Sequence, residues 1–236
     1  MIYARSLIFN FAFVIWTLVV SIILSPLLLT NPKTIGIVGR VWARGSIALL
    51  SFICNLKPEI RGIENLPQMP YIIASKHQSD LETILFHTVL PKPVYVLKKE
   101  LLAIPIFGYY LKKMGMIAID RNGQMNALKT MLKEAERTVS TGRPVIIFPE
   151  GTRTNPGMQV KYHPGITALY NQGKYNIVPV ALNTGVFWQK NSFVKKPGTY
   201  IIEFLPAIKP GLSKDEFIKN LYEQIEPKSI ALLDGE

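Results

Sequence analysis

The longest hydrophobic stretch of the chain lies near its N-terminus. No charged residue occurs between Arg5 and Lys33, and Leu7 to Leu29 is almost wholly apolar. As an α-helix this stretch would reach roughly 35 Å, enough to cross the hydrocarbon core of a bilayer. A long core helix of a soluble protein is the alternative, but such helices normally keep a polar face. The pattern therefore predicts a membrane helix, and since small residues at a cleavage point are missing, one that is retained in the mature protein.

A second apolar stretch, Val41 to Leu56, follows prolines at positions 26 and 32. It carries Arg44 and would reach only roughly 24 Å as a helix, too short to span comfortably. We expect either a hairpin joined through residues 31–39 that dips into one leaflet, or one span followed by a helix lying in the interface. The basic residues that follow the first helix predict a cytoplasmic position for the rest of the chain, because Arg40, Arg44, Lys57 and Arg61 outnumber Arg5.

From about residue 63 onward, short apolar runs alternate with helix-like segments. The strand-like runs are Tyr71 to Ser75, Val94 to Leu97, Met116 to Ile119, Val145 to Phe148 and Ile177 to Leu182. The helix-like segments are Leu81 to Val89, Ile106 to Met114, Met125 to Ser140, Ile166 to Gln172 and Ser213 to Gln224. This alternation predicts an α/β fold with a mixed, mostly parallel sheet flanked by helices. Tyr200 to Leu205 alternates in polarity and is expected to be an edge strand.

The pattern divides the chain into an N-terminal two-helix membrane-binding segment, residues 1–62, and an α/β domain, residues 63–236. The 236 residues carry a formal net charge of +11 while 48% of them are hydrophobic. A basic and apolar chain favours an anionic membrane surface as its partner. Nucleic acid is not expected, because the arginines stand at strand ends and not in a continuous basic stripe with interleaved aromatic residues. The single cysteine, Cys54, excludes a disulfide within the chain and fits a reducing compartment.

A histidine follows the strand-like run at residues 71–75. His77 should emerge at the carboxyl end of that strand, where ligands meet α/β sheets. The run from Ser79 to Glu82 fits a capping box, so a helix is expected to start between His77 and Glu82 and let the two side chains meet. A carboxylate beside an imidazole fixes the tautomer and stabilises the imidazolium. The pair is therefore a candidate base with its orienting acid.

Interpretations without catalysis also remain open for the same residues. Glu82 could serve only as a helix cap, with His77 an ordinary loop residue. Asp80 is a rival acid, but it is expected to face solvent at the helix N-terminus. His87 is expected to be packed or half-exposed inside the helix, and His163 in its loop is a candidate substrate contact only.

Two arginines end strand-like runs. In the run F-P-E-G-T-R at residues 148–153, Gly151 permits close approach of the backbone to a ligand, and Arg153 could grip a phosphate with two parallel hydrogen bonds. Arg121 ends the run at residues 115–121, and the two arginines could share one dianionic headgroup. Asp120, beside Arg121, is expected to pair with a basic side chain.

Four motifs, taken in order, resemble those of the glycerolipid acyltransferase superfamily, and the chain is similar to its bacterial members that act on 1-acyl-sn-glycerol 3-phosphate. The resemblance covers roughly residues 60 to 210. The matching residues are Lys76 to Ser79 with Glu82, then Gly115, Ile119 and Arg121, then Phe148 to Arg153, then Val178 to Val180. The family more commonly carries aspartate where this chain has Glu82, which reaches one methylene further.

The resemblance implies a reaction as well as a fold. It implies that His77, held by Glu82, removes the proton from the sn-2 hydroxyl of lysophosphatidic acid as that hydroxyl attacks an acyl thioester, giving phosphatidic acid. It implies an acceptor phosphate site made of Arg153, Arg121, Lys98, Gly151 and Thr152, supported by Glu150, Ser79 and Gln78. The donor would be acyl-CoA or acyl carrier protein, and neither a metal nor a further cofactor is expected. Membrane lipids are the expected partners, at the cytoplasmic membrane with the catalytic domain on its cytoplasmic face.

Two alternatives remain from the sequence. One is a related transferase with another acceptor, such as glycerol 3-phosphate or an aminolipid lysolipid. The other is a non-catalytic protein whose basic face recruits anionic lipid.

Overall fold

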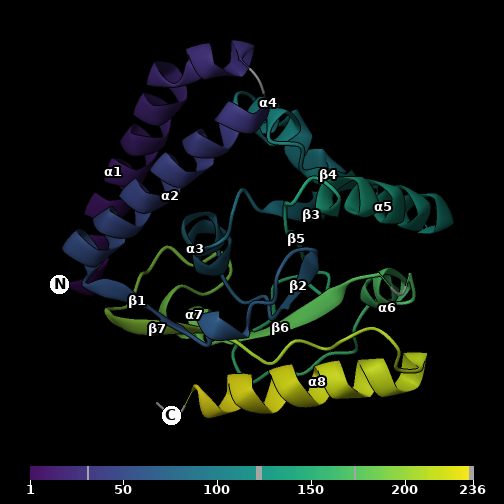
Figure 1. Cartoon of the computed structure of the whole chain (residues 1–236). Coiled ribbons are helices and arrows are strands. Elements are labelled where there is room, and N and C mark those ends of the chain that lie inside the picture. Colours follow the sequence, from purple (N-terminus) through teal and green to yellow (C-terminus); the bar gives the residue numbers. More distant parts are fainter. Residues whose placement is uncertain (31, 121–123, 173, 234–236) are drawn as a thin grey trace.

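A single mixed sheet forms the centre of the molecule (Figure 1). The structure is a computed structural model, and it describes the chain except for residues 31, 121–123, 173 and 234–236. Within the described residues the sheet has seven strands in the order β1-β7-β6-β2-β5-β3-β4. Their bounds are β1 Leu56–Arg61, β2 Tyr71–Ser75, β3 Val94–Lys98, β4 Ile117–Ile119, β5 Val145–Ile147, β6 Asn176–Leu182 and β7 Gly198–Phe204. All neighbouring pairs are parallel except β6 with β7, which confirms the predicted mixed, mostly parallel α/β sheet.

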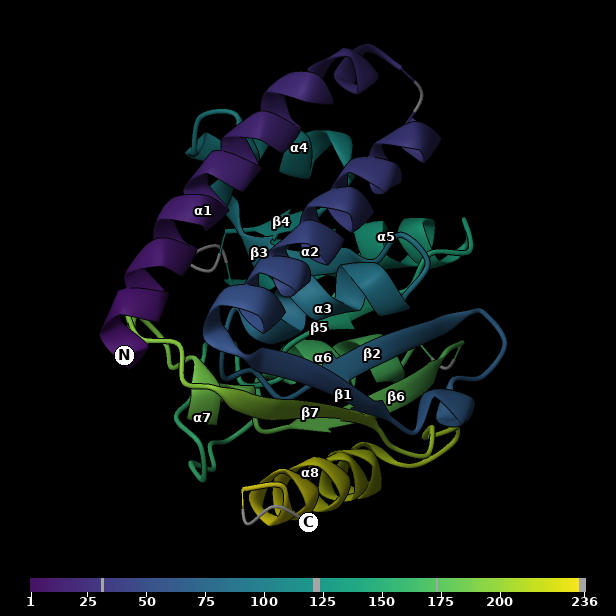
Figure 2. The ribbon, with the colours of Figure 1, turned by 90° about the vertical axis from the view of Figure 1, so that its left-hand side faces the viewer.

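Helices cover both faces of this sheet. Figures 1 and 2 show α8 across one face and α3 on the other, with α2 lying over α3. The α-helices after the N-terminal pair are α3 Leu81–Val89, α4 Phe107–Lys113, α5 Gln124–Val139, α6 Pro164–Tyr170, α7 Thr184–Phe187 and α8 Lys214–Ala231, and the 3-10 helices η2 Ile63–Asn65 and η3 Lys99–Ala103 lie between strands. Because helices screen both faces, the central strands are almost continuously apolar: every residue of β2 is buried.

Two long helices precede the sheet: α1, Ile2–Ile23, and α2, Pro32–Cys54, joined through the 3-10 helix η1, Ser25–Leu29. Both are long and apolar enough to cross a membrane by length and composition. Two tryptophan side chains form hydrogen bonds between these helices. Trp16 Nε1 donates to the carbonyl of Trp42 at 2.9 Å, and Trp42 Nε1 donates to Thr17 Oγ1 at 3.0 Å. Figure 2 shows the pair rising from the sheet over α3.

The prediction of a short second helix is wrong. Helix α2 begins at Pro32, not near Val41, and has 23 residues. A proline at the start of a helix loses no intrahelical hydrogen bond, because the N–H groups of the first turn have no partner inside the helix. Residues 32–39, expected as part of a connecting loop, are therefore helical, while residue 31 lies outside the described part of the chain.

Strand β1 was not predicted. It pairs in parallel with β7, so Tyr200 to Leu205, expected as an edge strand, lies inside the sheet and β1 forms the edge instead. The sequence of β1, with Pro58 and three charged residues, is typical of an edge strand and hides it from a search for apolar runs. The division of the chain at residue 62 stays a prediction, and β1 lies on the N-terminal side of it while belonging to the sheet.

Candidate active site

His77 lies two residues beyond β2, which is the fourth of the seven strands across the sheet and pairs in parallel with β5 and β6. Its Nδ1 is 2.8 Å from Glu82 Oε1. Helix α3 begins at Leu81, which places Glu82 in its first turn facing back toward the loop. The two predicted site residues therefore meet because the helix starts between them.

The predicted capping box is only half formed. Glu82 Oε1 accepts a hydrogen bond from the backbone N–H of Ser79 at 2.8 Å, as such a box requires. The Ser79 hydroxyl, however, accepts from Leu81 N at 3.2 Å, and Asp80 occupies the N-cap position. Helix α3 thus has the predicted range, Leu81–Val89, but its N-cap is Asp80 and not Ser79.

The carboxylate of Glu82 is fully buried and held from several directions. Besides the Ser79 N–H, its Oε1 accepts from Gln78 N at 2.7 Å, and its Oε2 accepts from the Thr184 hydroxyl at 2.7 Å. Thr184 begins α7, far along the chain, and no sequence signal connected it with this site. These contacts fix the carboxylate on the Nδ1 side of the imidazole.

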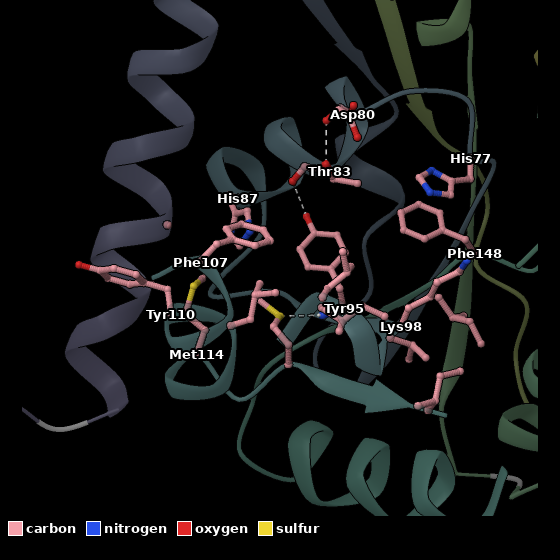
Figure 3. Close-up of a pocket in the computed structure, with 18 of the residues that line it drawn as sticks. His77, Asp80, Thr83, His87, Tyr95, Lys98, Phe107, Tyr110, Met114 and Phe148 are labelled. Atoms are coloured by element: carbon pink, nitrogen blue, oxygen red, sulfur yellow. Dashed lines mark hydrogen bonds between the residues drawn. The ribbon is translucent and has the colours of Figure 1, made fainter. Parts of the chain in front are cut away.

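This contact sets the tautomer of His77. A carboxylate can only accept, so Nδ1 must carry the proton and Nε2 is the basic nitrogen. The ring stacks on Phe148, with ring centroids 3.8 Å apart and planes inclined by 16°, and 16% of the side chain is exposed. Figure 3 shows His77 and Phe148 side by side at one side of a cavity that both line.

Glu150 joins the F-P-E-G-T-R turn to the histidine loop. Its Oε2 accepts from His77 N at 2.8 Å, and its Oε1 accepts from the Thr154 hydroxyl at 2.8 Å. Burial raises the pKa of this carboxyl, and the nearby Lys76 ammonium opposes the rise. Thr154 N donates to the carbonyl of His77 at 2.8 Å, so the backbone of His77 is bound on both sides.

The glycine of the same turn is required by geometry. Gly151 has φ of 66°, and a Cβ there would lie 2.7 Å from His163 Cδ2. A side chain at this position would be strained and would displace the His163 ring. His163, Gly151 and Thr152 line the same cavity as His77.

Arg153, which lines the same cavity, forms an ion pair with an acidic side chain. Its Nη1 donates to Asp80 Oδ2 at 2.8 Å. Asp80 was expected to face solvent, and its carboxylate, although half exposed, is instead engaged by Arg153. Lys190, which the sequence did not single out, lies nearby, with Nζ 3.3 Å from Thr152 Oγ1.

Lys98 and Arg121 were also predicted to bind the acceptor phosphate. Lys98 is exposed and lines the cavity. Arg121 lies outside the described residues. Asp120, expected to pair with a base, has its Oδ2 3.8 Å from Lys99 Nζ.

The cavity has a volume of about 1200 Å³ and extends from His77 to the N-terminal helices. Figure 3 places His87, Tyr110 and Met114 on the side away from His77. At that end the Tyr110 hydroxyl donates to the carbonyl of Ser21 in α1 at 2.7 Å. The apolar lining there comes from helices α1, α2 and α4 and from the residue that follows α4, and it includes Leu18, Val20, Val38, Leu111 and Met114. One end of the cavity is thus polar and the other apolar.

A second histidine lies at the apolar end. Burial, followed by the charge of Arg143, lowers the pKa of His87 to about 4. Its ring lies against Tyr95, with centroids 5.3 Å apart. His87 is therefore neutral at pH 7, and it lines the cavity as a packed side chain, as predicted.

Among the described residues, no group of three or more His, Cys, Asp or Glu side chains is arranged to hold a metal ion.

Comparisons with known proteins agree with the motif analysis. A family model described as Acyltransferase matches residues 57–183. The 1-acyl-sn-glycerol-3-phosphate acyltransferase of Pseudomonas aeruginosa is 39% identical over 167 residues, covering 71% of this chain and 65% of that protein. The enzyme of the same name from Saccharomyces cerevisiae is 30% identical over 193 residues, covering 78% and 64%. These alignments span slightly less than two thirds of either relative.

Another relative and a solved structure extend the comparison. The 1-acyl-sn-glycerol-3-phosphate acyltransferase of Limnanthes alba is 30% identical over 201 residues, covering 84% of this chain and 71% of that protein. The crystal structure of a 1-acyl-sn-glycerophosphate acyltransferase from Thermotoga maritima superposes with a TM-score of 0.82 at 18% identity, covering 100% of this chain and 99% of that one, which shows a shared fold. The family model covers more than half of the chain, so the protein belongs to the acyltransferase family.

Proposed function

We propose that the protein transfers a fatty acyl group from an acyl thioester to the sn-2 hydroxyl of lysophosphatidic acid, giving phosphatidic acid. The observation that carries this proposal is the His77–Glu82 pair, 2.8 Å apart, at the polar end of a cavity whose other end is apolar. The names of the aligned relatives support the same acceptor.

The chemistry needs one base and no protein nucleophile. Nε2 of His77 takes the hydroxyl proton as the acceptor oxygen attacks the thioester carbonyl carbon. The tetrahedral intermediate then expels the thiolate, which receives that proton from the imidazolium. Glu82 stabilises the imidazolium between the two transfers. General-base catalysis of this kind contributes about 10²- to 10⁴-fold, and alignment in the cavity adds to it.

The acceptor phosphate would bind at the polar end. Arg153, supported by Arg121, Lys98 and the turn at Gly151 and Thr152, is the proposed anion site. The phosphate would compete there with the Asp80 carboxylate for the guanidinium of Arg153. Because half of the Asp80 side chain is exposed, that ion pair contributes only about 0 to 1 kcal/mol, and a dianionic phosphate can replace it.

The acyl chain would occupy the apolar end. Each methylene moved out of water into such a lining stabilises binding by about 0.8 kcal/mol. The chain would point toward α1 and α2, with its carbonyl carbon beside His77. Acyl-CoA and acyl carrier protein both carry the thioester that this arrangement requires.

The N-terminal helices would keep this site at the bilayer. The N-terminal segment indicates membrane association, since much of α1 exposes apolar side chains, including Leu7, Ile8, Phe11, Val14, Ile22 and Ile23. We propose residues 1–62 as the membrane-associated segment and residues 63–236 as the α/β acyltransferase domain on the cytoplasmic face of the cytoplasmic membrane. Strand β1 would then tie the first part to the second.

An acceptor and donor panel tests the proposal. Purified protein in phospholipid vesicles would receive labelled palmitoyl-CoA with lysophosphatidic acid, glycerol 3-phosphate or lysophosphatidylethanolamine, and a parallel series would use palmitoyl-acyl carrier protein. We expect labelled phosphatidic acid as the main product. Faster transfer to either other acceptor would replace the proposed substrate, and no transfer with any pair would refute an acyltransferase activity.

A further inference from the structure

A lysine is buried directly before the catalytic histidine. Lys76 is 2% exposed, and its ammonium group has three acceptors. These are Glu150 Oε1 at 2.6 Å, Glu226 Oε2 at 2.8 Å and the carbonyl of Met158 at 2.9 Å. A lysine ammonium has three N–H donors, so every donor is used. The charge is therefore held in one place.

Glu226 brings the C-terminal helix into this network. It lies on α8, well beyond residues 57–183 that the family model matches, and is 1% exposed. Its other oxygen, Oε1, accepts from the Tyr162 hydroxyl at 2.6 Å. Both carboxylate oxygens are thus bound, one by Lys76 and one by the loop that follows the F-P-E-G-T-R turn.

The network reaches the reacting group through Glu150. The carboxylate that binds Lys76 through Oε1 binds the backbone N–H of His77 through Oε2. The chain of contacts therefore runs from Glu226 through Lys76 and Glu150 to His77. A shift of the Lys76 ammonium would move the Glu150 carboxylate. The backbone N–H of His77, which that carboxylate binds, would then move as well and change the position of the imidazole.

We propose that Glu226 is a positioning residue for His77, so that α8 is part of the catalytic unit. This inference rests on the proposed function of His77. Stability alone is a poor reason for such a cluster, because well-packed apolar residues often replace buried ion pairs without loss of stability. An apolar replacement could not hold the Glu150 carboxylate at a fixed position next to the backbone N–H of His77. A misplacement of about 1 Å at a reacting centre can cost about 100-fold in rate.

Two variants at one position separate the hydrogen bonds from the packing. Glu226→Leu keeps the volume and removes both acceptors. Glu226→Gln keeps an oxygen for Lys76, and its amide N–H₂ can donate to the Tyr162 oxygen. We expect kcat to fall about 10- to 100-fold in Glu226→Leu with the acceptor KM within about twofold, and to stay within about threefold in Glu226→Gln.

The matched control is a purely apolar residue of the same helix. Leu221 is fully buried in the hydrophobic core, and Leu221→Ala loosens α8 without touching the network. Loss of core volume should lower the melting temperature of this variant by an amount similar to that in Glu226→Leu, which leaves a buried charge with one partner fewer. Its kcat, measured well below that temperature, should stay near that of the wild type.

Amide hydrogen exchange gives a readout that needs no activity. We expect peptides covering residues 76–82 and 148–154 to exchange faster in Glu226→Leu and at the wild-type rate in Leu221→Ala. If Glu226→Leu does not fold, Glu226→Asp replaces it, because this variant keeps the charge and shortens the reach of the side chain. We then expect a smaller loss of kcat and the same pattern of exchange.

Equal kcat and equal exchange in Glu226→Leu and Leu221→Ala would overturn the inference. If the wild-type protein transferred no acyl group, the proposed function would fail while the exchange comparison still tested the coupling. If transfer depended on His77 but not on Glu226, only the coupling would fail.

Discussion

The two ends of the cavity differ in polarity, and His77 lines one end while His87 lines the other. At the polar end, His77 is hydrogen-bonded to Glu82 and lies near Arg153, Thr152 and the half-exposed Asp80. At the apolar end, His87 lies against Tyr95, and burial lowers its pKa to about 4. The same side chain is a candidate base in one place and a neutral, partly buried lining residue in the other. What separates the two histidines is a buried acid within hydrogen-bonding distance.

Substitutions at the two ends should therefore have different effects. Changes at the polar end should alter the rate and the binding of the acceptor. Changes at the apolar end should alter the preferred acyl chain and the stability while leaving the chemical step intact.

The largest effect is expected from replacing each of the two histidines in turn. His77→Ala removes the base, so kcat should fall about 10²- to 10⁴-fold. His87→Leu, at the other end of the same cavity, should keep kcat within about tenfold. Initial rates with labelled acyl-CoA at saturating acceptor measure both. An equal loss in the two variants would abolish the distinction between the ends.

The low pKa of His87 predicts a loss of stability in acid. Above pH 6.5 the histidine is neutral in both the folded and the unfolded chain and contributes nothing to the pH dependence. As the pH falls from 6.5 toward 4, the unfolded chain takes up a proton that the folded chain does not, so stability decreases. The loss attributable to His87 should reach at most about 3 kcal/mol.

Chemical denaturation in detergent at pH 7 and pH 4.5 tests this effect. The wild type should lose more free energy of unfolding on acidification than His87→Leu does. Identical losses would mean that His87 is protonated in the folded state.

Arg153 should govern binding of the acceptor. Arg153→Ala should raise the KM for lysophosphatidic acid about 10- to 100-fold, because a charge-assisted contact contributes about 1.5 to 3 kcal/mol. The KM for the acyl donor should change little. Asp80→Ala removes the competing carboxylate and should lower the acceptor KM slightly. A rise of the donor KM alone would place the donor, and not the acceptor, beside Arg153.

The smallest effect is expected at the apolar end. Val38→Phe reduces the space next to α1, so the preferred acyl chain should shorten by about two methylenes, with each lost methylene contact costing about 0.8 kcal/mol. Val41→Phe is the control, because Val41 lies on the exposed side of the same helix, 38% exposed. Competition among acyl-CoA donors of different length measures the shift, and an unchanged profile in Val38→Phe would remove the acyl chain from this end.

Local patterns in the sequence predicted the parts of the site that depend on nearby residues. The run from Ser75 to Glu82 contains both the strand end and the helix start, so the meeting of His77 and Glu82 followed from the capping pattern. The central strands were found because burial on both faces makes them continuously apolar. Strand β1 and the start of α2 were missed, because a polar edge strand and a helix that begins with proline lack these signals.

The remaining contacts depend on residues far apart in the chain. Thr184, Lys190 and Glu226 contact the site through the tertiary fold and not through nearby residues of the sequence. In the sequence Glu226 is one of several charged residues of α8, most of which are exposed, and nothing local marks it as buried. Arg153 was expected to be available for a phosphate, and the structure pairs it with Asp80, an acid that is remote from it in the sequence.

The tautomer of His77 is the most direct test of the proposed base. ¹⁵N NMR of the imidazole nitrogens in labelled protein at pH 8, with the signals assigned by comparison with His77→Gln, distinguishes a protonated nitrogen from a bare one. We predict a proton on Nδ1, next to the Glu82 carboxylate, and an unprotonated Nε2. A proton on Nε2 instead would leave the cavity without its base and contradict the mechanism.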